Sequence, residues 1–146
     1  MPTKNSIFIS YRRSDSDYVT GQVYEKLRSH FGPSVVFKDT HSIPLGQDFR
    51  KYIDQAIDES QVLIAVIGAR WLDALNERTA GNSDDYVKAE IETALAKGDM
   101  PVIPLLIEGV TMPSGQDLPE SLKDFSYRNA AKVRPALDFN QDVDRL

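Results

Sequence analysis

Apolar residues along the chain fall into two alternating patterns. Short apolar runs, which are typical of β-strands, alternate with longer segments in which apolar residues recur every three or four positions, as on one face of a helix. The strands predicted in this way are residues 6–10, 35–37, 62–67, 101–107 and 130–133. The predicted helices are residues 17–30, 48–59, 71–75 and 84–97, with one or two helical turns at 120–125.

The same pattern predicts which side chains face the core. In the first helix these are Tyr18, Val19, Val23 and Leu27. In the second helix they are Phe49, Tyr52, Ile53, Ala56 and Ile57. Residues 76–83 are polar and are predicted to form a loop.

Alternation of strands and helices favours an α/β fold, in which a parallel sheet is covered by helices on both faces. Residues 62–67 are uniformly apolar, as expected of a central strand. Pro104 is tolerable only near a sheet edge or a strand end. Ligands of such folds bind outside the carboxyl ends of the strands, where the predicted loops are 11–16, 38–47, 68–71 and 108–113.

Residues 84–97 carry a candidate chemical group. Ser83 can cap this helix, and an apolar stripe runs along it through Val87, Ile91, Ala94 and Leu95. Glu90 lies beside the stripe and has no Lys or Arg three or four positions away, whereas Glu92 has Lys88 one turn before it. A carboxylate in this position invites a functional interpretation, although a partly exposed boundary glutamate is common.

The composition excludes several classes of function. The chain has no cysteine, which rules out disulfides, thiol catalysis and thiolate metal sites, and His30 and His41 lack metal-ligand spacing. The net charge is −5 and no basic block is present, which argues against nucleic acid or an anionic membrane as the main partner. A length of 146 residues predicts one domain. Neither a secretory signal nor a membrane-length apolar run is visible, so we expect a cytoplasmic protein.

Common phosphate-binding motifs are missing. The first strand ends in Ser10-Tyr11-Arg12-Arg13, where a phospho-receiver domain needs acidic residues for Mg²⁺. Neither GxxxxGK[ST] nor GxGxxG occurs in the sequence. The pattern alone permits a flavodoxin-like domain, in which any nucleotide is held in some other way.

Four segments carry a resemblance to a known family. They are IFISYRR at 7–13, FKDTHSIPLGQDF at 37–49, YVKAEI at 86–91 and PVIPLLIEGVTMP at 101–113. In this order and spacing the sequence resembles the TIR domain family (Toll/interleukin-1 receptor/resistance). The second segment is similar to the BB loop of that family and the third to its W-x-x-x-E-I segment. Arg128-Asn129-Ala130 resembles a motif of bacterial members, and the nearest group is the bacterial, NAD-cleaving type.

The resemblance implies a flavodoxin-like three-layer fold with a central five-stranded parallel sheet. We expect the TIR domain to span residues 1–138, with residues 139–146 starting a last helix that continues into further domains. The implied activity is that of an NAD+ glycohydrolase, which releases nicotinamide and gives ADP-ribose or a cyclic isomer in bacterial immune or effector signalling. NAD+ is then the substrate, with no cofactor and no metal.

The alternative is a non-catalytic module that assembles with other TIR domains. In the family the two are compatible, because a neighbour's BB loop, here residues 39–49, often completes the active site. We therefore expect self-association through this loop in either case.

The family's catalytic glutamate falls on Glu90. Nicotinamide leaves NAD+ without needing a general acid, and the positive charge that develops on the ribose is stabilised by a carboxylate. Tyr86 replaces the commonest family residue, Trp, and keeps an aromatic face. We expect Tyr11 and Tyr86 to stack on ligand rings, and Arg12 and Arg13 to hold the pyrophosphate.

Four further residues complete the candidate substrate-binding set: Asp39, Gly46, Phe49 and Trp71. Asp39 would order the loop or contact ribose, and Gly46 would let the backbone approach the ligand. Structural roles stay open for the same residues. Tyr11, Phe49 and Trp71 are suited to a core, and Asp39 and Gly46 to a turn. The two arginines can instead form surface ion pairs with Asp15, Asp17 or Asp39.

Overall fold

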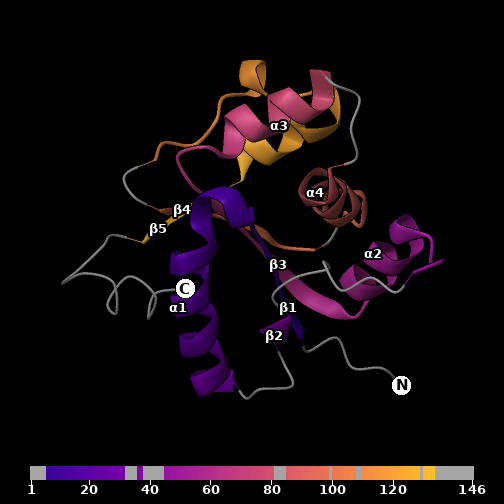
Figure 1. The fold of residues 1–146 in the computed structure, drawn as a ribbon, viewed down its shortest axis with the longest axis vertical. Helices are drawn as coiled ribbons and strands as arrows, with labels where there is room; N and C mark the ends of the chain where they lie inside the picture. The colour runs from indigo at the N-terminus through magenta and orange to yellow at the C-terminus, as the bar shows by residue number, and fades with distance from the viewer. Residues whose placement is uncertain are drawn as a thin grey trace.

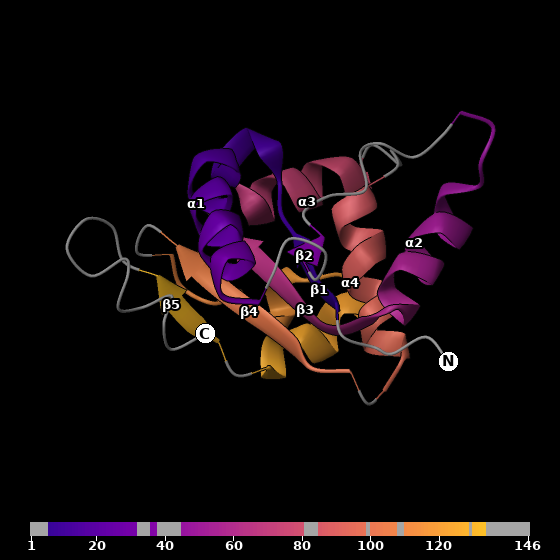
Figure 2. The same cartoon turned by 90° about the horizontal axis from the view of Figure 1, so that it is seen from below.

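A parallel β-sheet runs through the middle of the molecule (Figure 1, Figure 2). The computed structural model describes residues 6–31, 36–37, 45–80, 85–98, 100–107, 110–128 and 130–133. These residues form a five-stranded sheet in the order β2-β1-β3-β4-β5, and every neighbouring pair is parallel. The strands are β1 Ser6–Ser10, β2 Val36–Phe37, β3 Ser60–Ile67, β4 Val102–Ile107 and β5 Ala131–Val133. The predicted α/β fold with a five-stranded parallel sheet is confirmed.

Helices cover both faces of the sheet. One face carries α1 Arg13–Phe31, which lies apart from the other helices in Figure 1. The opposite face carries α2 Phe49–Asp58, α3 Trp71–Ala80, α4 Tyr86–Ala96 and the 3-10 helix η2 Glu120–Tyr127, which follows the short η1 Gly115–Asp117. The result is three layers.

The side chains of β3 contribute to two hydrophobic cores, one on each face of the sheet. Ile64 and Val66 pack with the residues under α1, whereas Leu63, Ala65 and Ile67 pack with those under α2, α3 and α4. Successive strand side chains point to opposite faces, so a strand covered on both sides must be apolar throughout. The predicted central strand is confirmed in this position.

Two helices begin at aspartate caps. Asp48 accepts a hydrogen bond from the Arg50 backbone N–H at 2.9 Å at the start of α2. Asp85 accepts one from the Lys88 backbone N–H at 3.3 Å at the start of α4. Each cap satisfies an N–H group that the first helical turn leaves without a partner. The cap predicted at Ser83 falls outside the described residues, and the structure assigns that role to Asp85.

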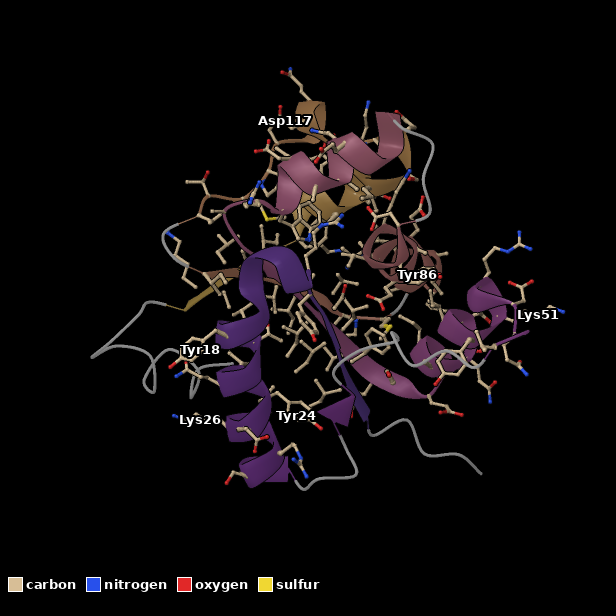
Figure 3. All side chains as sticks on the ribbon, in the orientation of Figure 1. Tyr18, Tyr24, Lys26, Lys51, Tyr86 and Asp117 are labelled. Carbon is tan, nitrogen blue, oxygen red and sulfur yellow. The ribbon has the colours of Figure 1, made fainter. Side chains whose placement is uncertain are left out.

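The prediction for α1 was wrong in two respects. The helix begins at Arg13 rather than at residue 17, so only Tyr11 and Arg12 separate it from β1. Tyr18, predicted to face the core, is 78% exposed and points away from the sheet (Figure 3). At about 100° per residue Tyr18 lies half a turn away from Leu27, which is buried with Val23 and Thr20.

α3 is longer than predicted. Residues 76–80 belong to the helix, so the polar loop predicted for 76–83 was wrong over that part. Over residues 71–77 of this helix, where burial is described, Trp71 and Leu75 are buried, and Asn76 and Glu77 are exposed. Polar residues there mark a solvent-facing helical surface, which a pattern of hydrophobicity does not distinguish from a loop.

Pro104 lies within β4, between β3 and β5. Pro101 accepts a hydrogen bond from the Leu63 N–H of β3 at 3.1 Å. Because bonding direction alternates along a strand, the missing N–H of Pro104 falls on the β5 side. β5 begins opposite Leu105, one residue later, so Pro104 lies where the described pairing with β5 starts. The predicted requirement for a strand edge is met locally.

Several predicted features lie outside the described residues. They are residues 32–35, residues 38–44 of the loop predicted at 38–47, and the final helix predicted at 139–146. No helix in the described part of the chain combines the length and the apolar character that crossing a bilayer requires.

Candidate functional site

The carboxyl ends of β1 and β3 meet the N-terminus of α4, and three buried side chains come together there. Arg12 follows β1, Trp71 begins α3 just after β3, and Asp85 caps α4. Arg12 Nη1 lies 3.0 Å from Asp85 Oδ1, and Nη2 lies 2.7 Å from Oδ2. The guanidinium carbon lies 5.7 Å from the centroid of the Trp71 ring. We refer to Arg12, Trp71 and Asp85 as the arginine cluster.

Strand alternation explains why Arg12 reaches this cluster. Phe8 packs on the α4 side of the sheet, and the period of two carries the side chain of Arg12 to that same side. Tyr11 falls on the opposite side, buried with Ile7 and Ile9 in the core under α1. The structure therefore separates Tyr11 from Arg12 and gives Tyr11 the core position that was its alternative role.

Glu90 is buried on α4, with 4% of its surface exposed. The buried residues of this helix are Val87, Glu90, Ile91 and Ala94. Tyr86, one turn before Glu90, is half-buried and packs against the core beneath α4 (Figure 3). Glu90 is thus withdrawn from solvent more completely than the boundary position that its place beside the stripe predicted.

Buried charge is confined to two segments of the described chain. Among the described residues the buried charged side chains are Arg12, Asp85 and Glu90. Arg12 lies two residues after β1, Asp85 caps α4 and Glu90 lies within α4. Burying a charge is costly unless it is matched, and sets of buried ionisable groups are typical of functional sites. The Arg12 guanidinium matches the charge of Asp85 in a two-point contact.

Two buried polar atoms, one at the end of β1 and one within the cluster, also point to a functional region. Within the described residues, Ser10 Oγ at the end of β1 and Trp71 Nε1 have no hydrogen-bond partner. Buried polar atoms are normally satisfied, so such exceptions need an explanation, for example a ligand or a water molecule.

The turn before α2 is the most exposed apolar feature of the described chain. Leu45 is fully exposed at 102% and stands beside Gly46, whose φ of 83° is left-handed. A Cβ on Gly46 would meet no atom within 4 Å. Glycine is therefore favoured here by the left-handed backbone conformation and not by a lack of space for a side chain. The turn interpretation of Gly46 is supported, and its contact with a ligand stays a prediction.

Three candidate residues are not placed. Asp39 lies outside the described residues, and so do the side chains of Arg13, which opens α1, and Phe49, which opens α2. The described residues include no group of three or more His, Asp or Glu side chains suited to holding a metal ion.

Asp85 is the site residue that sequence reasoning missed. Arg12 and Asp85 are 73 positions apart in the sequence, so no local spacing of residues predicts their contact. The helix-capping position of Asp85 was the available signal, because an N-cap after a strand in a parallel sheet lies at the same edge as the strand ends.

Comparisons with known proteins agree with this architecture. A family model described as TIR domain matches residues 7–146. No curated protein matches the sequence. The chain is similar to the TIR domains in the structure of the activated Roq1 resistosome directly recognizing the pathogen effector XopQ, with a TM-score of 0.69 and 13% identity over 97% of this chain and 96% of that one.

A second similar structure is a metazoan TIR-STING receptor from C. gigas in complex with 2',3'-cGAMP. The TM-score is 0.65 and the identity 18%, over 99% of this chain and 39% of the receptor chain. The chain therefore spans well under half the length of that receptor. At these identities the likeness shows the fold.

Proposed function

The chain belongs to the TIR domain family, and from this premise we propose that it is an NAD+ glycohydrolase. The reaction cleaves the bond between nicotinamide and ribose, and yields nicotinamide with ADP-ribose or a cyclic isomer. NAD+ is the substrate, and the activity serves immune or effector signalling.

The observation that carries this proposal is the burial of Glu90 on α4, the helix that Asp85 caps. Glu90, Asp85 and Arg12 are the buried charged residues of the described chain. Asp85 is engaged in a two-point contact with Arg12. Asp85 also caps α4, which is a structural role, and the family resemblance points to Glu90, so we assign Glu90 to the substrate.

The chemistry requires one well-placed negative charge. As nicotinamide departs, positive charge develops on the ribose in an oxocarbenium-like transition state. A carboxylate withdrawn from water stabilises that charge more strongly than a solvated one does, because the local dielectric is lower. Glu90 supplies this carboxylate, and Tyr86, one turn earlier and half-buried, stacks on a ring of the ligand.

The other substrate contacts are assigned by family resemblance. Arg13 holds the pyrophosphate, whereas Trp71 is fully buried and supports the site from the core. Asp39, Gly46 and Phe49 contribute from the BB loop and the start of α2.

The test follows nicotinamide release from NAD+ over a series of protein concentrations. We expect wild-type turnover and at least a ~100-fold loss in Glu90→Gln, which keeps the shape of the side chain and removes its charge. Glu92→Gln is the matched control, because Glu92 lies on the same helix and is only half-buried. Equal turnover by wild type and Glu90→Gln would falsify the catalytic assignment.

A non-catalytic interaction module is the second candidate. The fully exposed Leu45 beside Gly46 favours it, since an apolar side chain at a turn tip is suited to docking. Self-association without nicotinamide release at any protein concentration would select this function over the enzymatic one.

A further inference from the structure

We infer that Arg12 is a positioning residue that sets the location of Glu90 through Asp85, and that it does not hold the pyrophosphate. The inference rests on the proposed NAD+ cleavage, since it assigns a role within that site. It replaces the ligand-binding role that the sequence predicted for Arg12.

The guanidinium is already engaged. Its two terminal nitrogens donate to the two oxygens of Asp85, at 3.0 and 2.7 Å. This paired geometry is the one that an arginine would use to grip a phosphate. The Trp71 ring lies 5.7 Å from the guanidinium carbon, and only 5% of the Arg12 surface is exposed. Binding a pyrophosphate in the same way would require breaking a buried ion pair.

Asp85 links this contact to the helix that carries Glu90. Its Oδ1 accepts from Arg12 Nη1 and also from the Lys88 backbone N–H, so one carboxylate joins the end of β1 to the first turn of α4. Glu90 follows five positions later in the same helix. With a rise of about 1.5 Å per residue, Glu90 lies roughly 7.5 Å along the axis from the anchored residue.

The apolar contacts of α4 do not supply the same constraint. Val87, Ile91 and Ala94 hold the helix against the core. Hydrophobic contact is non-directional, so it tolerates a slide of the helix along its own axis. A two-point hydrogen bond between a strand end and a helix cap prevents that sliding. It thereby sets the axial position of α4 and the distance from Glu90 to a bound ribose.

The experiment separates the ion pair from the cap. Asp85→Asn removes the charge and keeps an oxygen that caps α4. Arg12→Met removes the guanidinium, and the double variant Arg12→Met/Asp85→Asn removes both charges of the pair together. For each variant we measure the midpoint of urea unfolding, and we measure kcat and KM for nicotinamide release, with kcat corrected for the folded fraction.

We expect both single variants to unfold at lower urea and the double variant to recover most of that loss. In all three, kcat falls by about 10-fold to 100-fold, the loss expected of a reacting group displaced by ~1 Å, while KM changes by less than about 3-fold. Lys123→Met, which breaks an exposed pair with Glu120 at 2.9 Å, is the control and keeps wild-type kcat.

Three outcomes overturn the inference. One is a double variant with wild-type kcat, because the pair then serves stability alone. The second is a double variant that does not fold, because the pair is then needed for the fold itself. The third is a raised KM in Arg12→Met with normal kcat, since Arg12 then contacts the ligand. A wild-type chain without turnover overturns the proposed function instead, so the two failures are distinguishable.

Discussion

Lys97 Nζ lies 2.8 Å from Asp54 Oδ1, and this contact joins the C-terminal end of α4 to α2. Asp58, one turn further along α2, lies at the same distance from the same nitrogen. α2 follows the exposed turn at residues 45–47, and α4 carries Glu90. One ammonium group therefore connects the helix after the predicted BB loop with the helix that bears the candidate carboxylate.

Replacing Lys97 with Met removes this connection and keeps the aliphatic stem. We expect Lys97→Met to lower the free energy of unfolding by up to about 1 kcal/mol, the upper range for ion pairs near the surface. Urea unfolding at pH 7 measures the change. Lys123→Met is the matched control, because its ion pair with Glu120 joins residues of one short segment and is more exposed. Equal effects of the two substitutions would contradict the special role given to Lys97.

The same pair makes a prediction about pH. Hydrogen bonds to Asp54 and then to Asp58 raise the pKa of Lys97 above its ordinary value of 10.5. A raised pKa means that the contribution to stability is complete below the unfolded-state value and is lost as the pH rises through the folded-state value. The stability difference between wild type and Lys97→Met should be constant from pH 7 to about 10 and shrink above about 10.5. A difference that persists undiminished at pH 12 would show that the charge is not its source.

Trp71 is predicted to be a major source of stability. It is fully buried, its ring centroid lies 5.8 Å from that of Phe125, and it supports the Arg12 guanidinium. We expect Trp71→Ala to cost about 3–5 kcal/mol of unfolding free energy, and Trp71→Phe clearly less. Phenylalanine keeps an aromatic ring. Its lack of an N–H group costs no hydrogen bond, because Trp71 Nε1 has no partner among the described residues. Thermal unfolding followed by far-UV circular dichroism checks this, and similar losses for both variants would argue against ring packing as the cause.

Tyr86 is predicted to act through its ring. Tyr86→Phe should retain turnover, whereas Tyr86→Ala should raise KM by about 2-fold to 10-fold, the value of one stacking contact. Tyr127→Ala is the control, because Tyr127 is exposed at the end of η2. The measurement is the kinetics of nicotinamide release. A rise in KM for Tyr86→Phe as large as that for Tyr86→Ala would assign the contact to the hydroxyl group instead.

Much of the fold was predictable because buried strands and half-buried helices have different patterns of apolar residues. The uniformly apolar run of β3 identified the central strand, and the recurrence of Ile53 and Ile57 identified the buried face of α2. Patterns were less informative at helix ends and on exposed surfaces. The polar end of α3 resembles a loop, and Tyr18 is apolar enough to be assigned to a core that it does not reach.

The candidate site was less predictable because its contacts are not local. Neighbouring residues Tyr11 and Arg12 were assigned one ligand, yet strand alternation places them on opposite faces of the sheet. The contact of Arg12 with Asp85 depends on the fold bringing a strand end and a helix cap together. Glu90 was identifiable from its place beside the apolar stripe of its helix and from the family resemblance, and the structure buries it more deeply than that boundary position predicted.

Leu45 is predicted to serve association and not stability. Its side chain is fully exposed at the turn before α2, so Leu45→Ser should change the free energy of unfolding by less than about 0.5 kcal/mol. The loss of an exposed apolar contact should instead weaken self-association and shift turnover to higher protein concentration. Sedimentation velocity and a concentration series of nicotinamide release measure the two effects. Gln47→Ser is the matched control, an exposed polar neighbour in the same turn. If Leu45→Ser associates and turns over like wild type, the turn is not the contact surface, and an interface elsewhere must complete the site.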